Sequence, residues 1–527
     1  MIIFSLFIFI VMLMFGGIAV DLMLYENKRT HVQNSTDRAV LAAANLNQSV
    51  DPKSVVADYL NKAGVAVQDD DIDVYEIGTA PVITGRQVAV NVTGAFDTIL
   101  MHLVGVNSLS YNASSQAEES VNDIEVSLIL DISGSMGSNS KLSNMQSAAK
   151  DFVSGILEGA SDDRVSVSLV PYSTQVSAGP ELLAQLSTTH NHSSSHCVNF
   201  ETADFGTTAI QRVNPGNGTP IALSQTAHFD PWRHYNSGRS LYYPVCRSNS
   251  YAEILPWSND AIEINNQIDD LTARGNTSID VAVKWGAALL DPSMNSALNA
   301  LIANPNVTVD SAFSPRPHPY TNTDALKFIV VMTDGINTRQ YYLRDSYKEG
   351  LSDMYRTGTP SNPQYVMHLP GNSSNQRWWN LNTRNYVSAP SNDPTTLAAM
   401  RLTKLAMWSQ MSMKWRAYNG FYRRTWNADD YYDELYDPRT YTNDTAKDDR
   451  MEDICDAAKD EGIVIFSIGF EVTDHSANVM RDCASTPNHF YRVEGLDIEY
   501  AFASIKNQIN QLKLTQSDNL PSSFENA

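Results

Sequence analysis

Cysteine and basic residues are scarce in this chain of 527 residues, and each scarcity excludes a class of protein. Four cysteines are too few for a disulfide-dense scaffold, although they allow two disulfides or none. Lysine and arginine number 37 against 59 aspartates and glutamates, which gives a net charge of −22. Because so acidic a chain repels phosphate backbones, we expect no nucleic-acid partner. The same charge favours hard cations, which bind carboxylate and hydroxyl oxygens.

The motifs of nucleophilic, nucleotide-binding and zinc-dependent enzymes are absent as well. The sequence contains no G-x-S-x-G elbow, no G-x-x-x-x-G-K-[ST] loop and no H-E-x-x-H helix. Ser135 has carboxylate and hydroxyl neighbours rather than an evident histidine base, so we interpret it as a ligand and not a nucleophile. We therefore predict a protein that is not an enzyme.

A long apolar run forms the N-terminus, interrupted in its first twenty residues only by Ser5 and the Gly16-Gly17 pair. Twenty helical residues span about 30 Å, which is the hydrocarbon thickness of a bilayer. The alternative is a cleaved signal peptide, but the run is long for one and no basic region precedes it. We predict an uncleaved transmembrane anchor over residues 1–22 and a helical stalk over residues 23–48.

A polar stripe continues this helix, because polar residues recur every four positions: Asp21, Tyr25, Arg29, Gln33 and Asp37. With the apolar run before it and Leu41-Ala42-Ala43-Ala44 after it, residues 1–48 resemble the N-terminal segment of TadE/TadG-like proteins. Those proteins belong to the tight-adherence (Flp) pilus assembly system. The resemblance implies a single-pass anchor in the inner (cytoplasmic) membrane, a periplasmic bulk, and other pilus-assembly or envelope proteins as partners.

The orientation of the anchor has one contrary signal. Lys28 and Arg29 follow the apolar run, and taken alone they would keep this side in the cytoplasm. A long following domain can still be translocated despite such charges, and we expect the extracytoplasmic orientation.

Residues 49–120 mix the patterns of helix and strand and predict a small α+β unit. Within it we expect an amphipathic helix over 54–63, strands over 73–77, 87–92 and 109–113, a helix over 95–106 and a polar linker over 116–123.

Residues 121–515 alternate buried strands with amphipathic helices, which is typical of a doubly wound parallel sheet. Apolar-rich runs predict strands over 124–130, 164–170, 326–332 and 462–470. Helical spacing predicts helices over 142–156, 279–290, 448–459 and 497–512. Two long insertions, about 177–257 and 337–444, interrupt the alternation, and residues 516–527 are left as a tail.

The second insertion is rich in aromatic residues and holds five of the eight tryptophans. Within it the apolar spacing predicts one helix over 394–415. Such residues are common in binding hot spots, but they also suit an insertion that must build its own core. We favour the core.

Oxygen-bearing side chains follow two of the predicted strands and open one helix. Asp131, Ser133 and Ser135 form a D-x-S-x-S motif after the first strand, and Asp334 follows the strand 326–332. Between them Thr277 lies in a glycine-containing loop before the helix 279–290. Because ligands of open α/β sheets bind at the carboxyl ends of strands, we expect these loops to converge. Carboxylate and hydroxyl oxygens suit Mg²⁺ or Mn²⁺ rather than Zn²⁺.

This trio, in this order, resembles the metal-ion-dependent adhesion site of von Willebrand factor A domains, whose fold is Rossmann-like. The resemblance implies that Ser133, Ser135 and Thr277 bind the ion directly, that Asp131 and Asp334 act mainly through water, and that a partner's acidic group completes the coordination. The expected function is therefore metal-dependent protein binding in pilus assembly. The alternatives are a surface adhesin or accessory subunit unrelated to pili, and a von Willebrand A subunit of a metal-dependent enzyme complex.

The four cysteines allow two bridges in an oxidising compartment. Cys197 and Cys246 lie in the first insertion, whereas Cys455 and Cys483 lie on either side of the strand 462–470. Pairing within each set is our prediction. The alternative for Cys197 is a zinc site with histidines of the same insertion: His190, His192, His196, His228 and His234. We disfavour this zinc site because no second cysteine lies nearby.

Overall fold

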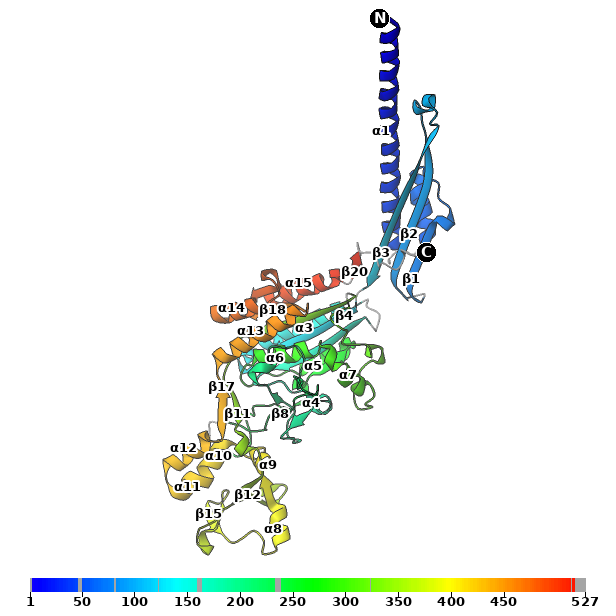
Figure 1. The fold of residues 1–527 in the computed structure, drawn as a ribbon. Helices are drawn as coiled ribbons and strands as arrows, with labels where there is room; N and C mark the ends of the chain where they lie inside the picture. The colour runs from blue at the N-terminus through cyan, green and yellow to red at the C-terminus, as the bar shows by residue number, and fades with distance from the viewer. Residues whose placement is uncertain are drawn as a thin grey trace. The chain divides into compact units, whose positions relative to one another are not determined.

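The computed structural model describes residues 2–45, 50–79, 82–121, 123–158, 164–232, 238–322, 324–512 and 514–516. The chain divides into two compact units, Met1–Asn122 with Asn510–Ala527 and Asp123–Ile509 (Figure 1). The predicted stalk end at residue 48 and residues 517–527 of the predicted tail lie outside the described residues.

A single helix, α1 (Ile2–Ala44), combines the predicted anchor and stalk. Among the described residues it is the one helix long and apolar enough to cross a membrane. Its first half is exposed, whereas residues from Val32 to Ala44 pack in a core with α2 (Pro52–Lys62) and the sheet of the first unit. Helix α2 begins where Asp51 accepts a hydrogen bond from the backbone N–H of Ser54.

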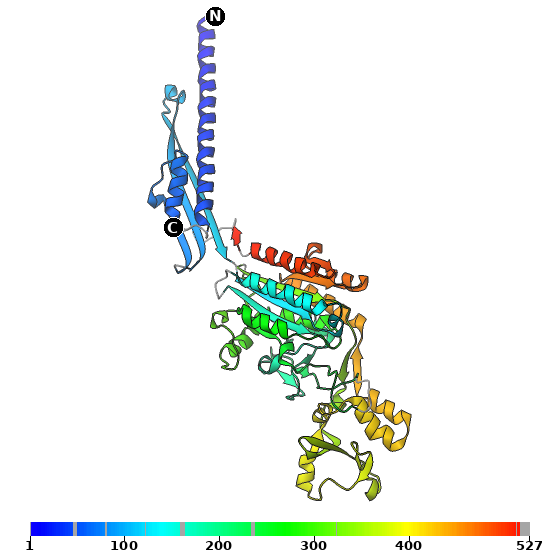
Figure 2. The same cartoon turned by 180° about the vertical axis from the view of Figure 1, so that it is seen from behind.

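The sheet of the first unit is antiparallel, in the order β1 (Ile72–Thr79), β2 (Val82–Asp97), β3 (Ser108–Val121) and β20 (Leu514–Gln516). Figure 2 shows β2 and β3 running as a long hairpin beside α1. The predicted helix over 95–106 is wrong, because β2 continues to Asp97 and only Met101–Val104 forms a 3-10 turn, η2. The predicted linker over 116–123 is also wrong. Its residues to Val121 extend β3, and those to Ser120 pair with β2 despite their polarity.

The sheet of the second unit has the order β19-β18-β10-β4-β5-β9. Five strands are parallel and β9 pairs antiparallel at one edge: β4 (Asp123–Asp131), β5 (Val165–Tyr172), β9 (Leu255–Ser258), β10 (Ala325–Thr333), β18 (Val464–Phe470) and β19 (Phe490–Val493). The four predicted strands agree with β4, β5, β10 and β18 within two residues at each end. Sequence periodicity missed the two short edge strands.

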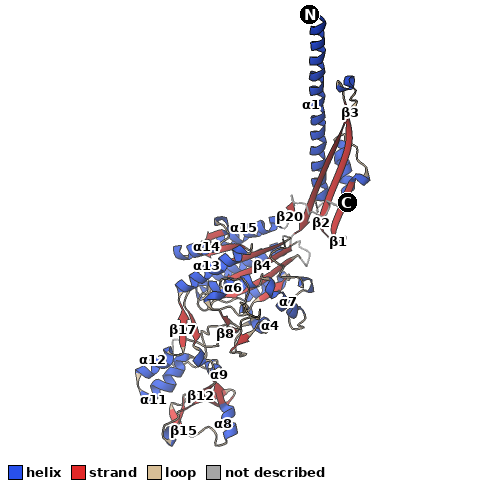
Figure 3. Ribbon diagram, in the orientation of Figure 1, coloured by secondary structure: helices blue, strands red, loops and turns tan. Residues whose placement is uncertain are grey.

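Helices cover both faces of this sheet (Figure 3). One core contains apolar side chains of α3 (Lys141–Leu157), α5 (Ala261–Asp270) and α15 (Asp497–Leu512). The other contains those of α6 (Ile279–Ala288), α7 (Asn295–Ile302), α13 (Asp444–Asp460) and α14 (Asp474–Cys483). Strand β4 alternates between them, with Leu128 and Leu130 in the first core and Ile129 in the second. Strands β4, β5 and β10 are therefore buried on both faces along most of their length.

The two insertions fold into small sheets and short helices. The first contains α4 (Gly179–Leu183) and the sheet β6-β8-β7: Thr188–Thr189, Leu223–Gln225 and Val198–Asn199. The second begins and ends with the antiparallel pair β11 (Gln340–Leu343) and β17 (Arg439–Thr442). Its five-stranded sheet has the order β15-β14-β13-β12-β16: Asn385–Val387, Trp378–Asn380, Asn362–His368, Leu351–Thr359 and Arg401–Thr403.

The helix predicted over 394–415 is wrong. The segment forms α8 (Pro394–Met400), α9 (Lys404–Trp408) and α10 (Met413–Arg416), because β16 intervenes and pairs with β12. The insertion continues through a π-helical turn (Ala417–Tyr422), α11 (Arg423–Thr425) and α12 (Ala428–Tyr436). Trp379, Trp408 and Trp415 join a core that also includes Phe229 of the first insertion. The aromatic residues thus build a core shared by both insertions.

Candidate metal centre

Two carboxylates lie at one edge of the parallel sheet because their strands are neighbours. Asp131 ends β4, and Asp334 follows the last residue of β10. Leu130 and Met332 are paired in register, so both chains leave the sheet side by side. The loop before α6, which contains Thr277, is bound to the loop after β4 by two backbone hydrogen bonds. Gly134 N donates to Gly275 O (2.9 Å), and Arg274 N donates to Ile132 O (2.8 Å).

The hydroxyls of the predicted site converge with Asp334. Ser133 Oγ and Ser135 Oγ are 3.0 Å apart, and Ser135 Oγ donates to Asp334 Oδ1 at 2.6 Å. A Cβ placed on Gly335 would lie 3.8 Å from both Ser135 Oγ and Thr277 Oγ1, which brings Thr277 to the same point. Ser135 is exposed and the other members are buried, so the cluster opens at Ser135.

Asp131 lies one step deeper and is fully buried. Its carboxylate accepts hydrogen bonds from Ser133 N and Thr333 Oγ1, both at 2.7 Å, and from Tyr172 OH at 3.3 Å. Burial, assisted by the charge of Asp334, raises the pKa of Asp131 to about 6. The Asp131 carboxylate therefore orients the loop of Ser133 through the hydrogen bond from Ser133 N. Its own negative charge is poorly compensated by its surroundings.

Two charged residues that sequence reasoning missed complete the cluster. Lys141, the first residue of α3, places its Nζ 3.1 Å from Asp334 Oδ2 and 3.4 Å from Glu471 Oε2. Glu471 directly follows β18. The signal that identified Asp131 and Asp334, an acidic residue at the carboxyl end of a buried strand, could have found Glu471. Lys141 gave no such signal.

A buried ion pair supports the Thr277 loop from within the unit. Lys447 of α13 donates to Thr277 O (2.9 Å), Ser278 Oγ (2.6 Å) and Thr338 O (2.9 Å). Its Nζ is 3.6 Å from Asp280 Oδ1, and both side chains are 0% exposed. Burial lowers the pKa of Lys447 and raises that of Asp280, while each partner's charge opposes the other's shift. Lys447 thus positions Thr277 without lying among the candidate ligands.

The donor set fits a hard cation better than a soft one. Among the described residues no group of three histidine, cysteine, aspartate or glutamate side chains could hold a metal ion. Asp131 and Asp334 supply two carboxylates, and Ser133, Ser135 and Thr277 supply the hydroxyls. Carboxylate, hydroxyl and water oxygens are the ligands that suit Mg²⁺ and Mn²⁺.

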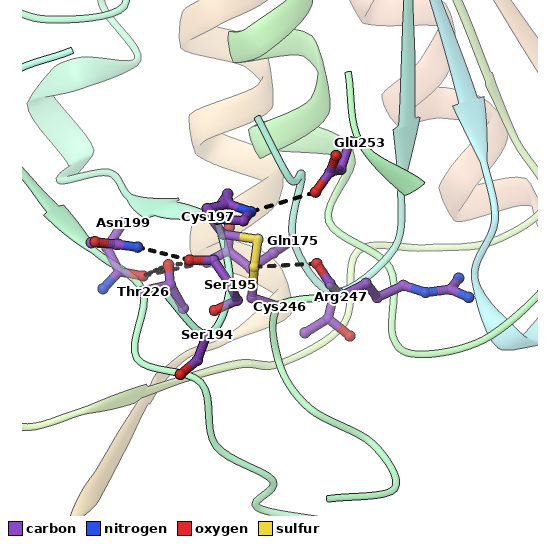
Figure 4. Close-up of a disulfide and its surroundings, with 12 residues drawn as sticks. Gln175, Ser194, Ser195, Cys197, Asn199, Thr226, Cys246, Arg247 and Glu253 are labelled. Carbon is purple, nitrogen blue, oxygen red and sulfur yellow. Dashed lines mark hydrogen bonds and ion pairs between the residues drawn. A yellow bond between two sulfur atoms is a disulfide. The ribbon is translucent and has the colours of Figure 1, made fainter. Parts of the chain in front are cut away.

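The cysteines form two disulfides, Cys197–Cys246 and Cys455–Cys483, with Cα atoms 5.9 Å and 5.1 Å apart. Figure 4 shows the first of them between Gln175, Asn199 and Glu253. Thr226 N donates to Cys197 O at 2.8 Å, which links the bridge to the small sheet of the insertion.

Cys197 is not available to the alternative zinc site because it forms this disulfide. His196 instead pairs with Glu253 at 3.4 Å, and His192 Nε2 contacts Thr226 O at 2.9 Å. Burial lowers the pKa of His228 to about 4. Within the described residues, no three histidine, cysteine, aspartate or glutamate side chains form a group that could hold a metal ion, and His234 lies outside those residues.

A polar and aromatic cavity of about 580 Å³ adjoins the metal-site loops. Gly134 and Asn276 line it from the loops, and Trp232, Tyr242 and Tyr243 line it from the first insertion. The Arg274 guanidinium lies 4.1 Å from the ring centroid of Tyr242 and 5.0 Å from that of Tyr243. The insertion therefore supplies a recess beside the open side of the cluster.

Comparison with known proteins identifies the N-terminal segment. Residues 1–46 match the model of a family described as putative Flp pilus-assembly TadE/G-like, which confirms the resemblance found in the sequence. No curated protein matches the chain.

Several solved structures align with much of the chain at low similarity. The vWF domain of the type V pili tip protein Mfa5 from Porphyromonas gingivalis is 15% identical, over 76% of this chain and 99% of that one, with a TM-score of 0.32. The pilus adhesin SpaC from Lactobacillus rhamnosus GG is 13% identical, over 84% and 34%, with a TM-score of 0.28. The adhesive tip pilin GBS104 from Group B Streptococcus agalactiae is 12% identical, over 73% and 100%, with a TM-score of 0.28. TM-scores this low do not establish a shared fold.

Proposed function

We propose that this chain is a membrane-anchored, extracytoplasmic protein of Flp/Tad-type pilus assembly. Its second unit acts as a von Willebrand A-type domain, doubly wound and Rossmann-like, with two insertions. The match of residues 1–46 supports the pilus context, and α1 suits a single-pass anchor in the inner membrane. Two disulfides suit an oxidising compartment such as the periplasm. The protein would bind other pilus-assembly or envelope proteins and catalyse no reaction.

One observation carries the binding mechanism: three hydroxyls and Asp334 converge at the carboxyl edge of β4 and β10. Ser133, Ser135 and Thr277 would hold Mg²⁺ or Mn²⁺ directly, with Asp131 and Asp334 acting through water. The bound ion would supply a Lewis-acidic position for a partner's carboxylate. Ser135 is the exposed member, so the partner's acidic side chain would approach past it. The neighbouring recess with Trp232 and Arg274 would contact residues flanking that side chain.

The test compares two serines of one loop. Ser135→Ala removes a proposed ligand, whereas Ser138→Ala, also exposed, changes a serine outside the set. Full-length protein in detergent is titrated with Mn²⁺ alone, and bound ion is followed by electron paramagnetic resonance. We expect Ser135→Ala to weaken Mn²⁺ binding at least tenfold and Ser138→Ala to leave it unchanged.

The same variants, expressed in the source cell, test the biological role. Ser135→Ala should lose surface pili or pilus-dependent adhesion, as should chelator-treated wild-type cells, whereas Ser138→Ala should not. Equal Mn²⁺ affinity for both variants would contradict the metal site. A normal pilus phenotype with lost Mn²⁺ binding would contradict its role in assembly.

A further inference from the structure

The tip of the β2–β3 hairpin, residues 98–106, is apolar and exposed. Ile99, Leu100, Leu103 and Val104 are 58%, 40%, 73% and 39% exposed. His102 is the only polar side chain from residue 99 to residue 106. An apolar surface of this kind, free of lysine, arginine, aspartate and glutamate, is costly to leave in water.

Helix α1 fixes the position of this tip. The Asp21 carboxylate accepts hydrogen bonds from the backbone N–H groups of Ile99 (3.1 Å), Leu100 (2.7 Å) and Met101 (2.6 Å). Leu100 also packs so closely on Gly17 that a Cβ there would lie 2.9 Å from the Cβ of Leu100. Asp21 is 0% exposed as a result. The tip is therefore held at one level of the helix.

That level lies inside the apolar run of the helix. Gly17 precedes the last residue of the run, Val20, by three positions, or about 4.5 Å along the helix axis. Leu13, which lines a groove with the tip residues Leu100 and Leu103, is 59% exposed. If α1 crosses a bilayer through its apolar run, the tip must enter the leaflet from which the helix emerges. This holds for either orientation of the protein.

The backbone of the tip is suited to such a place, because seven of its N–H groups have hydrogen-bond partners within the unit. Those of residues 99–101 bind Asp21, and those of Leu103, Gly105 and Val106 bind carbonyls of the tip itself. Thr98 closes the loop through its N–H to Asn107 O at 3.0 Å. Unpaired backbone groups would exclude the segment from lipid, and these groups are satisfied.

We propose that the hairpin tip is a membrane-inserted wedge, bound to lipid acyl chains and headgroups beside α1. Tip and helix together line a groove of about 620 Å³, and its walls are apolar residues and glycines, among them Leu13, Val20 and Leu103. Lipid chains fit this groove without any charged contact. The Asp21 carboxylate lies at the membrane boundary, where its hydrogen bonds to the tip hold the wedge against α1.

The experiment uses the full chain in phosphatidylcholine vesicles. The structure holds all four cysteines in disulfides, so a single introduced cysteine carries a fluorophore alone. Leu103→Cys labels the wedge, and Tyr75→Cys, 62% exposed on β1, is the control. We expect nitroxide lipids to quench the label at 103 and aqueous iodide to quench it at least fivefold less than at 75. Equal iodide quenching at both sites overturns the proposal, as does protection of 103 from both quenchers, because protein would then cover the tip.

Two positions of α1 test how the helix holds the tip. In the Leu103→Cys background, Gly17→Leu places a side chain against Leu100, whereas Phe15→Leu changes an exposed residue of the same apolar run. We expect Gly17→Leu to reduce lipid quenching at 103 at least twofold and Phe15→Leu to leave it unchanged. Equal quenching in the two variants contradicts the placement of the wedge by α1. Circular dichroism and intact disulfides establish that each variant is folded.

Discussion

Two buried aspartates, one in each unit, have their charges balanced in different ways. Asp21 of α1 accepts three backbone N–H groups of the hairpin tip. Asp131 at the end of β4 accepts one backbone N–H and two hydroxyls, and it lies in a cluster with Asp334. Burial and the charge of Asp334 raise its pKa to about 6.

The difference separates a structural carboxylate from one suited to a cation. Backbone amides spread the charge of Asp21 over the loop that it holds, so an ion would add nothing there. Around Asp131 the acidic side chains Asp334 and Glu471 share one lysine, Lys141, whose contacts at 3.1 Å and 3.4 Å are with those two. Negative charge in excess of its compensation is what a divalent cation relieves.

The largest effect is expected at a third buried aspartate, Asp280, whose charge is balanced by Lys447. Lys447→Met removes the cation from a fully buried pair and should lower the free energy of unfolding by about 3–5 kcal/mol. Lys459→Met on the same helix changes a lysine whose side chain is 26% exposed, and it should cost less than 1 kcal/mol. Denaturant unfolding followed by tryptophan fluorescence measures both.

The loss of stability caused by Lys447→Met should also depend on pH. Burial raises the pKa of Asp280, so the folded state holds this proton at a higher pH than the unfolded state does. The stability of Lys447→Met should then rise as the pH falls from 8 towards 5, because a protonated Asp280 needs no cation. An equal deficit at both pH values would contradict the view that the ion pair, rather than packing, is lost.

The comparison of Asp21 with Asp131 predicts that the same substitution changes Mn²⁺ affinity at one position and not at the other. Asp131→Asn removes charge next to the proposed ligands and should weaken Mn²⁺ binding by about 10- to 100-fold. Asp21→Asn should leave Mn²⁺ affinity unchanged, because its carboxylate serves only the hairpin tip. Calorimetric titration of both full-length variants checks this. A comparable loss in Asp21→Asn would show that global unfolding, and not the site, governs binding.

The smallest expected effect is an increase in Mn²⁺ affinity when Lys141 is replaced. Lys141 holds an ammonium against Asp334 and repels a cation nearby, so Lys141→Met should raise Mn²⁺ affinity, by about tenfold at most. Lys150→Met on the same helix, where Lys150 pairs with Asp269 at 2.5 Å, is the control. If Lys141→Met weakens Mn²⁺ binding, the lysine supports the site instead of competing with the ion.

The strands of the second unit were predictable because both faces of the sheet are buried. Runs such as 328–332 are apolar throughout, and this composition can be read from the local sequence. Residues 95–106 were predicted wrongly for a related reason. Their apolar positions have helical spacing, yet Phe96 pairs with Leu109 across the hairpin, and the later ones form an exposed tip. Periodicity detects apolar spacing but not the surface that the apolar side chains face.

The candidate ligands could be named from sequence, but their supports could not. Asp131 ends one buried strand and Asp334 directly follows another, and these positions place both at one edge of the sheet. Lys447 reaches Thr277 across 170 residues and gives no local signal. The aromatic core likewise combines residues of both insertions, which only their folding brings together.

Local sequence patterns are enough to locate the apolar helix, the buried strands, and the acidic and hydroxyl residues at strand ends. Contacts between distant groups arise only when the chain folds. The hairpin tip binds Asp21, Lys141 joins Asp334 and Glu471, and Lys447 supports the loop of Thr277. Composition and spacing fix how each segment partitions between water and an apolar interior. Pairing between remote side chains depends on the path of the chain between them, which no local pattern encodes.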